Sequence, residues 1–306
     1  MRSGIFVYNP VSGNQMVSGS LDAILNQAFE RGLLLVPFRL YPAPENKALL
    51  TQLLLAPWVE FIIAAGGDGT LNAIAQEILT TRPGLPMGII PTGTCNDFAE
   101  SLHLPLSIRD CLAVVADGYT ESLDVGWVNG EKVFLCTCAA GVFVKTTYSV
   151  SSTLKRNLGA LAYYFSALGE LATVRSFPLT IETETETVSD NFLLFLLLNG
   201  TQAGGLPNLL SNAMMRDGYI DLLLIRDVPP IELPVFFREV INRENIDDGR
   251  WIKRMKGKRF RFDGPADVAT TLDGEEGLPL PIEVEVLPRA LTVYVNKPNY
   301  QTIDEV

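Results

Sequence analysis

A cluster of glycines around one aspartate is the stretch of this sequence whose residue types point most directly to chemistry. The apolar run Val59–Ala65 leads into Gly66-Gly67-Asp68-Gly69-Thr70-Leu71-Asn72, and a helical pattern follows to about Leu79. Glycines let the backbone approach an anion, and the N-terminus of the next helix turns free N–H groups toward phosphate. The pattern indicates a nucleotide phosphate beside a carboxylate that faces a metal ion. A tight turn with Asp68 as a helix cap is the alternative.

A second loop repeats the combination of small residues, an amide and an acid. The strand pattern Met87–Ile90 leads into Pro91-Thr92-Gly93-Thr94-Cys95-Asn96-Asp97-Phe98-Ala99. Because ligands bind at the carboxyl ends of strands in open α/β sheets, we expect Asp68 and Asp97 to converge on one crevice. Asn96-Asp97 taken alone also fits a helix-capping pair. The Walker A and dinucleotide-binding patterns do not fit, because the lysine of the first and the glycine spacing of the second are missing.

The elements that position these loops alternate between strand and helix over the first 125 residues or so. Such alternation predicts a parallel sheet with helices on its faces. The expected strands and helices before the first loop are Ile5–Tyr8, Gly19–Arg31, Leu33–Leu40, Glu45–Leu55 and Val59–Ala65.

Beyond Val125 the pattern changes to short, often alternating strands. Asn129-Gly130 between two apolar stretches is a strong hairpin signal. Helices are expected near Gly159–Leu171 and Ile231–Asn242. The remaining segments predict a mainly antiparallel second domain, with strands at Leu179–Thr187, Phe192–Leu198, Tyr219–Ile225, Lys258–Phe262, Ile282–Val286 and Leu291–Val295.

Composition restricts the possible functions. The chain has 306 residues, 35 acidic and 24 basic, and a net charge of −11, which argues against nucleic acid as a partner. We find no apolar run of 18 residues, so we expect no membrane span. Four cysteines, Cys95, Cys111, Cys136 and Cys138, do not form a disulfide framework in a chain of this length and fit a reducing cytoplasm. His103 is the single histidine, which argues against zinc sites and histidine-based triads.

The two loops together resemble the signature pair of the bacterial diacylglycerol kinase and YegS-like lipid kinase family. Further matches extend along essentially the whole chain. They are Asn9-Pro10-x-Ser12-Gly13, Asp124, Leu158-Gly159-x-Leu161-Ala162-Tyr163, Asp217-Gly218-Tyr219-Ile220-Asp221 and Leu272-Asp273-Gly274-Glu275. One departure is Asn14, which stands where the family often has a basic residue.

The resemblance implies an ATP- and Mg²⁺-dependent lipid kinase with two domains and an active site in the cleft between them. An NAD-kinase-like α/β domain is expected over residues 1–126, with 290–306 returning to it, and a β-sandwich-like domain over 127–289. The resemblance assigns Asp273 as general base with Glu275 as its neighbour, and Asp68, Asp97 and Asp217 to Mg²⁺. The nucleotide site would comprise Asn9, Ser12, Gly66, Gly67, Asp68, Gly69, Thr70, Thr94 and Asn96.

These assignments agree with the chemistry of phosphoryl transfer. Catalysis there is mostly positioning and neutralisation of phosphate charge, and Mg²⁺ prefers carboxylates and water. A carboxylate near the acceptor hydroxyl can take its proton. Asp273-Gly274 would otherwise be interpreted as a type I′ hairpin turn.

Residues 250–261 carry seven basic side chains and no acidic one: Arg250, Lys253, Arg254, Lys256, Lys258, Arg259 and Arg261. We expect this segment, Arg250 to Arg261, to help a cytoplasmic protein dock peripherally on anionic lipid. A solvated edge strand is the alternative, because charges on sheet edges prevent aggregation.

Three questions stay open at this point. The lipid acceptor is not specified, although diacylglycerol or a related glycerolipid, giving phosphatidic acid, is the first expectation. An NAD kinase, which shares Gly-Gly-Asp-Gly-Thr, and a non-catalytic lipid- or nucleotide-binding protein on the same fold are the competing classes. A homodimer, the commonest soluble assembly, is neither required nor excluded.

Overall fold

The protein is described by a computed structural model that covers residues 1–10, 16–41, 43–141, 175–205, 209–210, 213–229, 231–232, 235–236 and 249–296. It divides into two compact units. Unit 1 comprises Met1–Leu123 and Arg289–Val306, and unit 2 comprises Asp124–Pro288. The predicted helix at Gly159–Leu171 and most of the one at Ile231–Asn242 lie outside the described residues.

Unit 1 is built on a parallel sheet, as expected. Its strands are β1 (Arg2–Tyr8), β2 (Leu33–Arg39), β3 (Phe61–Gly66) and β4 (Met87–Pro91), in the order β2-β1-β3-β4. Every residue of β3 and β4 is buried, as in strands covered on both faces. The end of β15 (Ile282–Tyr294) adds a further parallel strand, with Val293 opposite Met87 of β4.

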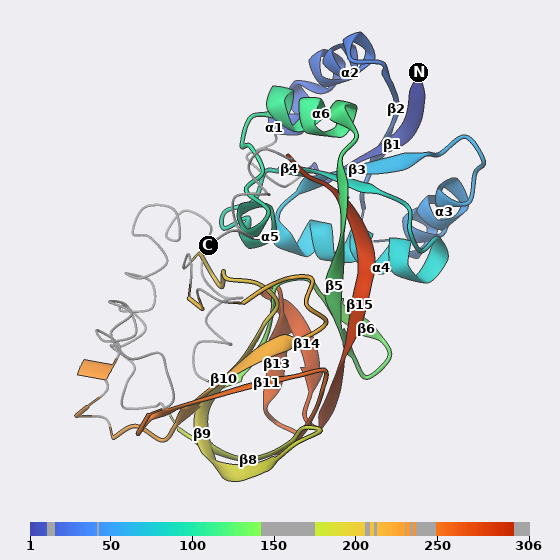
Figure 1. Cartoon of the computed structure of the whole chain (residues 1–306). Helices are drawn as coiled ribbons and strands as arrows, with labels where there is room; N and C mark the ends of the chain where they lie inside the picture. Colours follow the sequence, from blue (N-terminus) through green and yellow to red (C-terminus); the bar gives the residue numbers. More distant parts are fainter. Residues whose placement is uncertain are drawn as a thin grey trace. The chain divides into compact units, whose positions relative to one another are not determined.

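Helices cover both faces of this sheet, with α2 and α6 on one side and α3 and α4 on the other (Figure 1). Their bounds are α1 (Met16–Gly19), α2 (Leu21–Glu30), α3 (Pro44–Leu54), α4 (Asp68–Thr81), α5 (Asp97–Ser101) and α6 (Ile108–Asp117). The Ser107 hydroxyl caps α6 by accepting the Asp110 N–H, and Gly118 ends it with a positive φ of 80°. Unit 1 therefore has the α/β architecture that the alternating pattern predicted.

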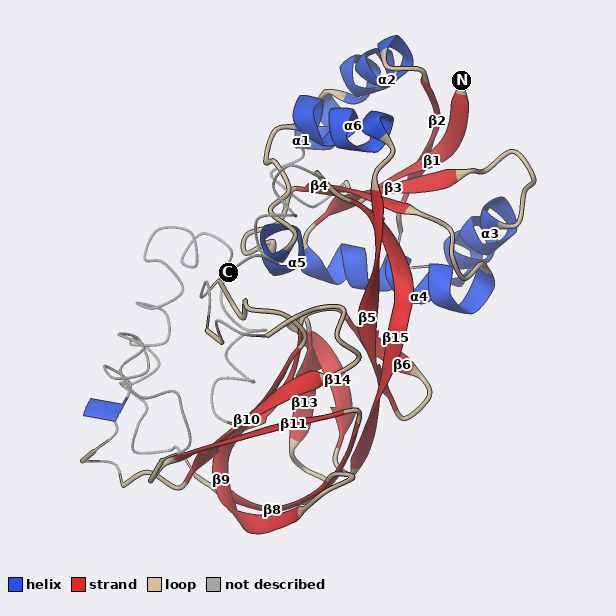
Figure 2. Cartoon of the chain, viewed as in Figure 1, coloured by secondary structure: helices blue, strands red, loops and turns tan. Residues whose placement is uncertain are grey.

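Unit 2 is antiparallel and consists almost entirely of strands in the part described (Figure 2). They are β5 (Thr120–Val128, shared with unit 1), β6 (Lys132–Phe134), β7 (Thr137–Gly141), β8 (Phe177–Glu182), β9 (Thr187–Leu198), β10 (Ile220–Arg226), β11 (Ile252–Gly257), β12 (Arg259–Asp263), β13 (Ala269–Leu272), β14 (Glu275–Pro279) and β15. The main path runs β14-β13-β7-β9-β8-β12-β15. The predicted hairpin is confirmed, because Asn129 and Gly130 have positive φ between β5 and β6.

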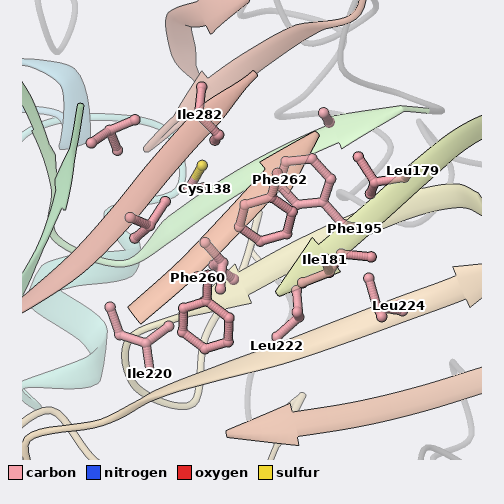
Figure 3. Close-up of a cluster of buried hydrophobic side chains, with 14 of the residues drawn as sticks. Cys138, Leu179, Ile181, Phe195, Ile220, Leu222, Leu224, Phe260, Phe262 and Ile282 are labelled. Carbon is pink, nitrogen blue, oxygen red and sulfur yellow. The ribbon is translucent and has the colours of Figure 1, made fainter. Parts of the chain in front are cut away.

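The core of unit 2 contains stacked phenylalanines among aliphatic side chains. Phe195 of β9 stacks on Phe262 of β12 at 4.4 Å between ring centroids, and Phe260 lies next to Phe262 at 6.1 Å. Ile181, Leu222 and Ile282 pack around them from three other strands (Figure 3). Burying several side chains of this size stabilises the unit by roughly 2 kcal/mol each.

Two strand predictions were wrong in extent. Leu179–Thr187 is not one strand: it turns at Thr183, whose hydroxyl accepts the N–H groups of Thr185 and Glu186, so β8 ends and β9 begins. The two segments predicted at Ile282–Val286 and Leu291–Val295 form the single strand β15. Its continuity was hidden by Pro288 and by Arg289, which has a positive φ of 51°.

Candidate active site

The two acidic loops of unit 1 meet, and Asp68 joins them. Gly66 ends β3 and Asp68 begins α4, so the carboxylate stands at a strand-to-helix turn. Its Oδ1 accepts a hydrogen bond from the backbone N–H of Phe98, at the start of α5, at 3.2 Å. Burial raises the pKa of the Asp68 carboxyl above its ordinary value, and backbone N–H groups of Phe98 and Asp97 offset part of that shift.

The loops approach each other through two glycines. A Cβ added to Gly93 would lie 2.5 Å from the Cα of Gly67, and one added to Gly67 would lie 3.0 Å from the Cα of Gly93. Asn96 fixes the second loop: its Oδ1 accepts the Gly93 N–H at 2.7 Å, and its own φ of 56° is one that asparagine tolerates. The absence of side chains at Gly67 and Gly93 therefore lets the backbones of the two loops come into contact, and the hydrogen bond from Gly93 to Asn96 fixes the conformation of the second loop.

Asn9 and Thr70 line the same region. The Asn9 Nδ2 donates to the Thr70 Oγ1 at 3.3 Å, and the Asn9 N–H donates to the Ala65 carbonyl at 3.2 Å. Thr70 itself packs where a Cβ on Gly66 would stand, 2.4 Å from its own Cβ. Ser12, the other nucleotide-site residue predicted from this part of the chain, lies outside the described residues.

The remaining predicted residues of unit 1 differ in exposure. Asp97 is buried at the first position of α5, whereas Thr94 is exposed at the turn before it and Gly69 is half-buried in the first turn of α4. His103 is exposed just after α5. The acidic and glycine residues thus gather at the ends of β3 and β4, as we expected for a ligand site in an open sheet.

Asp273 of unit 2 is held by three backbone N–H groups. Its Oδ2 accepts from Leu135 at 2.7 Å, and its Oδ1 accepts from Cys136 at 2.8 Å and Thr137 at 2.9 Å. The residue lies at the turn between β13 and β14, with a φ of 49° followed by 82° at Gly274. The hairpin alternative is therefore correct as local geometry, and the same turn fixes the carboxylate in one orientation. Glu275 follows at the start of β14 and is exposed.

Asp217 is engaged by a lysine. The Lys256 Nζ lies 2.6 Å from Asp217 Oδ2 and 3.8 Å from Asp221 Oδ2. Burial raises the pKa of the Asp221 carboxyl, and the charges of Lys256 and Arg254 partly offset the shift. In the sequence, Lys256 belongs to the basic segment and Asp221 to the Asp217 motif, but their contact was not predicted. It forms because Asp221 of β10 lies opposite Lys256 of β11.

Asp124 is buried beside this acidic segment. Its Oδ2 accepts the Gly218 N–H at 2.6 Å, and its backbone N–H donates to the Met215 carbonyl at 2.7 Å. Asp124 belongs to the residues that match the family, and the sequence indicated no role for it. The structure shows that it fixes the turn that carries Asp217.

The residues of unit 1 are suited to a nucleotide phosphate and a hard cation. The Gly67–Gly93 contact leaves backbone, rather than side chains, at the point where the loops meet, and the carboxylates of Asp68 and Asp97 are oxygen donors of the kind that hard cations prefer. Within the described residues no three His, Cys, Asp or Glu side chains form a cluster able to hold a metal ion. Mg²⁺ commonly completes such incomplete sites with water and substrate phosphate oxygens.

The basic segment, residues 250–261, is largely neutralised by acidic partners. Six of its seven basic side chains form ion pairs: Arg250–Glu232, Lys253–Glu186, Arg254–Asp221, Lys256–Asp217, Arg259–Glu285 and Arg261–Glu283. The Lys258 ammonium lies 4.8 Å from the centroid of the Tyr219 ring. The edge-strand alternative was wrong for β12, which pairs with both β8 and β15, and is confirmed for β11, which pairs with β10 alone among the described strands.

Comparison with known proteins identifies the class. Residues 3–128 match the diacylglycerol kinase catalytic domain, and residues 137–295 match the YegS C-terminal NAD kinase beta sandwich-like domain. The chain therefore belongs to the diacylglycerol kinase family of lipid kinases.

Individual relatives cover the chain from end to end. The diacylglycerol kinase of Bacillus subtilis (strain 168) is 30% identical over 100% of this chain and 100% of its own length. That of Staphylococcus carnosus (strain TM300) is 28% identical over 95% of this chain and 94% of its own. The solved structure of a diacylglycerol kinase from Bacillus anthracis str. Sterne aligns with a TM-score of 0.74 at 21% identity, covering 97% of both chains, which shows the shared fold.

None of the helices that the structure describes has the length and apolar content needed to cross a membrane.

Proposed function

We propose that this lipid kinase uses ATP and Mg²⁺ to phosphorylate a hydroxyl of diacylglycerol or a related glycerolipid, giving phosphatidic acid or its analogue. The observation that carries the proposal is the hydrogen bond between the Asp68 carboxylate and the Phe98 N–H, which brings two acidic, glycine-containing loops together. Asn9 and Thr70, hydrogen-bonded to each other at the same strand ends, extend this surface toward the nucleotide.

In this proposal the loops of unit 1 bind the triphosphate. The loop Gly66 to Thr70 contacts phosphate oxygens, Thr94 and Asn96 border the nucleotide, and Ser12 belongs to the same group by family resemblance. Asp68, Asp97 and Asp217 hold Mg²⁺, partly through water. When bound, the metal neutralises charge that develops on the phosphates. Lys256, whose Nζ lies 2.6 Å from Asp217 Oδ2, would compete with the cation for this carboxylate.

Asp273 is proposed as the general base. The acceptor O–H bond breaks and its proton passes to the Asp273 carboxylate, while the hydroxyl oxygen forms a bond to the γ-phosphorus and ADP leaves. Three N–H donors fix the direction of this carboxylate, which is what a base needs in order to be within reach of one hydroxyl. Glu275, two residues further on, is proposed to stand beside the reacting groups.

The test is transfer of labelled γ-phosphate from ATP and Mg²⁺ to diacylglycerol, monoacylglycerol, phosphatidylglycerol, a sphingoid base and an isoprenoid alcohol in mixed micelles, with NAD as a soluble acceptor. We expect label in diacylglycerol and none in NAD. Label in NAD alone would favour the NAD kinase alternative. A chain that labels no acceptor while still binding ATP would belong to the non-catalytic class.

We also propose that the cytoplasmic enzyme meets its lipid substrate peripherally at the membrane surface, with Arg250 to Arg261 contributing to contact with anionic lipid. Its ion pairs reduce the charge available for this contact. Each basic residue therefore contributes less than the ~1 kcal/mol of an unpaired one. Reversing Arg250, Lys253 and Lys258 to glutamate should weaken sedimentation with phosphatidylglycerol vesicles at low salt. If the variant bound the vesicles as well as the wild type, the proposal that this segment contacts anionic lipid would be wrong.

A further inference from the structure

Asn199 links two places in unit 2: the segment that holds the Asp273 carboxylate, and Asp124, which holds the turn that carries Asp217. It follows the last residue of β9, is 1% exposed, and its Nδ2 donates to two backbone carbonyls, those of Asp124 and Leu135, each at 2.8 Å. Its backbone N–H donates to the Cys136 carbonyl, also at 2.8 Å. One residue therefore ties the segment around Leu135 to Asp124.

The segment that Asn199 holds is the one that fixes Asp273. The carbonyl groups of Leu135 and Cys136 face Asn199, whereas the N–H groups of Leu135, Cys136 and Thr137 face the Asp273 carboxylate. At the other end, Asp124 accepts the N–H of Gly218, the neighbour of Asp217. A continuous chain of hydrogen bonds thus leads from Asp273 through Asn199 to the Asp217 turn.

The two polar atoms of the Asn199 side chain differ in their hydrogen bonding: Nδ2 has two partners, whereas Oδ1 has none among the described residues. Because Nδ2 faces two carbonyl oxygens, only the amide nitrogen can occupy that position, which fixes the orientation of the group. Its Oδ1 then points the opposite way and has no hydrogen-bond partner within the described part of the chain. A buried acceptor left unpaired costs about 1–3 kcal/mol. An apolar side chain would avoid this cost, so the two bonds from Nδ2 provide a reason for asparagine here.

We propose that Asn199 is a positioning residue for phosphoryl transfer: it sets the place of the Asp273 carboxylate relative to Asp124 and the Asp217 turn. This rests on the proposed role of Asp273 as base. Displacement of a reacting group by about 1 Å can lower a rate by about 10²-fold, so a loosened segment at residues 135–137 reduces turnover without affecting nucleotide affinity.

The test compares Asn199→Leu with Gln202→Leu. Gln202 lies three residues along the same chain segment, is also buried with an unpartnered amide oxygen, and has no hydrogen bond to Asp124 or residues 135–137 among the described residues. We expect Asn199→Leu to lower kcat about 10- to 100-fold with KM for ATP unchanged. Gln202→Leu should keep the wild-type kcat. Equal losses of kcat in the two variants would overturn the proposal.

A double-mutant cycle separates positioning from a general loss of structure. If Asn199 acts through Asp273, Asn199→Leu should change the residual rate of the Asp273→Asn enzyme less than about twofold. A full further loss in that background would contradict the inference. If Asn199→Leu gives too little folded protein, the isosteric Asn199→Asp replaces it, with the same expectation because an oxygen then faces both carbonyls.

Amide hydrogen exchange provides a readout that does not depend on activity. We expect faster exchange at residues 135–137 in Asn199→Leu and wild-type exchange in Gln202→Leu, with β3 unchanged in both. Unchanged exchange at residues 135–137 would overturn the positioning role even if kcat fell. A wild-type chain that phosphorylates no lipid would instead refute the proposed function, and the exchange result would still decide whether Asn199 holds the Asp273 segment.

Discussion

The Asp68 carboxylate accepts a hydrogen bond from the backbone N–H of Phe98 at 3.2 Å. An acid at the turn after β3 thereby satisfies an N–H group in the first turn of α5, the helix that follows β4. This bond joins the Asp68 loop to the Asp97 loop, which are separated in sequence by α4 and β4. Burial raises the pKa of the Asp68 carboxyl, and the hydrogen bond from Phe98 offsets part of that rise. The bond therefore has a structural effect and leaves a charge that a bound cation would stabilise.

Replacing Asp68 separates these two effects. Asp68→Asn retains an oxygen for the Phe98 N–H but lacks the charge, whereas Asp68→Ala lacks both. We expect both variants to lose phosphoryl transfer, and only Asp68→Ala to have a lower thermal midpoint. Circular dichroism melting and the labelled-ATP assay measure the two outcomes. Asp22→Asn, at an exposed acid in the first turn of α2, is the control and should match the wild type.

The contact between Gly67 and Gly93 predicts a steric requirement. A methyl group on Gly93 would lie 2.5 Å from the Gly67 Cα and 2.8 Å from the Asn96 Oδ1, and backbone cannot yield cheaply. Gly93→Ala should therefore lower the unfolding midpoint and weaken ATP binding, measured by calorimetry. Gly19→Ala, where a Cβ meets nothing within 4 Å, should change neither. Wild-type ATP affinity in Gly93→Ala would show that the loops have room to separate.

Removal of the proposed base should affect chemistry more than binding. Asp273→Asn should lower kcat by about 10²–10⁴-fold, because the acceptor proton then has no carboxylate to receive it. Equilibrium binding of ATP should stay at the wild-type value. Glu276→Gln, an exposed neighbour in the same hairpin, is the matched control. Retention of more than about a tenth of the wild-type kcat would exclude Asp273 as the base.

Two buried thiols predict a loss of stability at alkaline pH. Burial raises the pKa of Cys111 from 9.0 to about 12 and raises that of Cys138 further. The unfolded chain therefore loses these protons at lower pH than the folded protein, so folding stability falls as pH rises from about 9 toward 12. The unfolding midpoint of Cys111→Ala/Cys138→Ala should fall less steeply between pH 8.5 and about 10.5 than that of the wild type. Parallel curves would contradict this assignment.

The sequence predicted unit 1 well because its signals are local. Strands β1, β3 and β4 are largely buried apolar runs, of which β3 ends at Gly66 and β4 at Pro91, and they were predicted to within about three residues. The meeting of the Asp68 and Asp97 loops followed from the rule for strand ends. What periodicity could not predict was the turn at Thr183, since the alternation of glutamate and threonine continues through it while a hydroxyl redirects the backbone.

In unit 2 the sequence predicted the acidic site residues but not the groups that hydrogen-bond to them or form ion pairs with them. Asp273 was identified by its motif, whereas its three N–H donors come from residues 135–137, far away in the chain. Asn199 followed by glycine resembles an ordinary turn, and only the folded structure shows what its amide contacts. The ion pairs of the basic segment were equally hidden, because each partner lies on another part of unit 2.

Strand β15 has a consequence for synthesis of the protein. Val293 pairs with β4, and Tyr294 contacts Phe61 and accepts a hydrogen bond from Arg2, so residues near 290 complete the sheet of unit 1. A ribosome makes them only after all of unit 2. Until then β4 presents an open apolar edge, the kind of surface that promotes misfolding and aggregation. The sheet of unit 1 therefore stays incomplete while unit 2 is being translated.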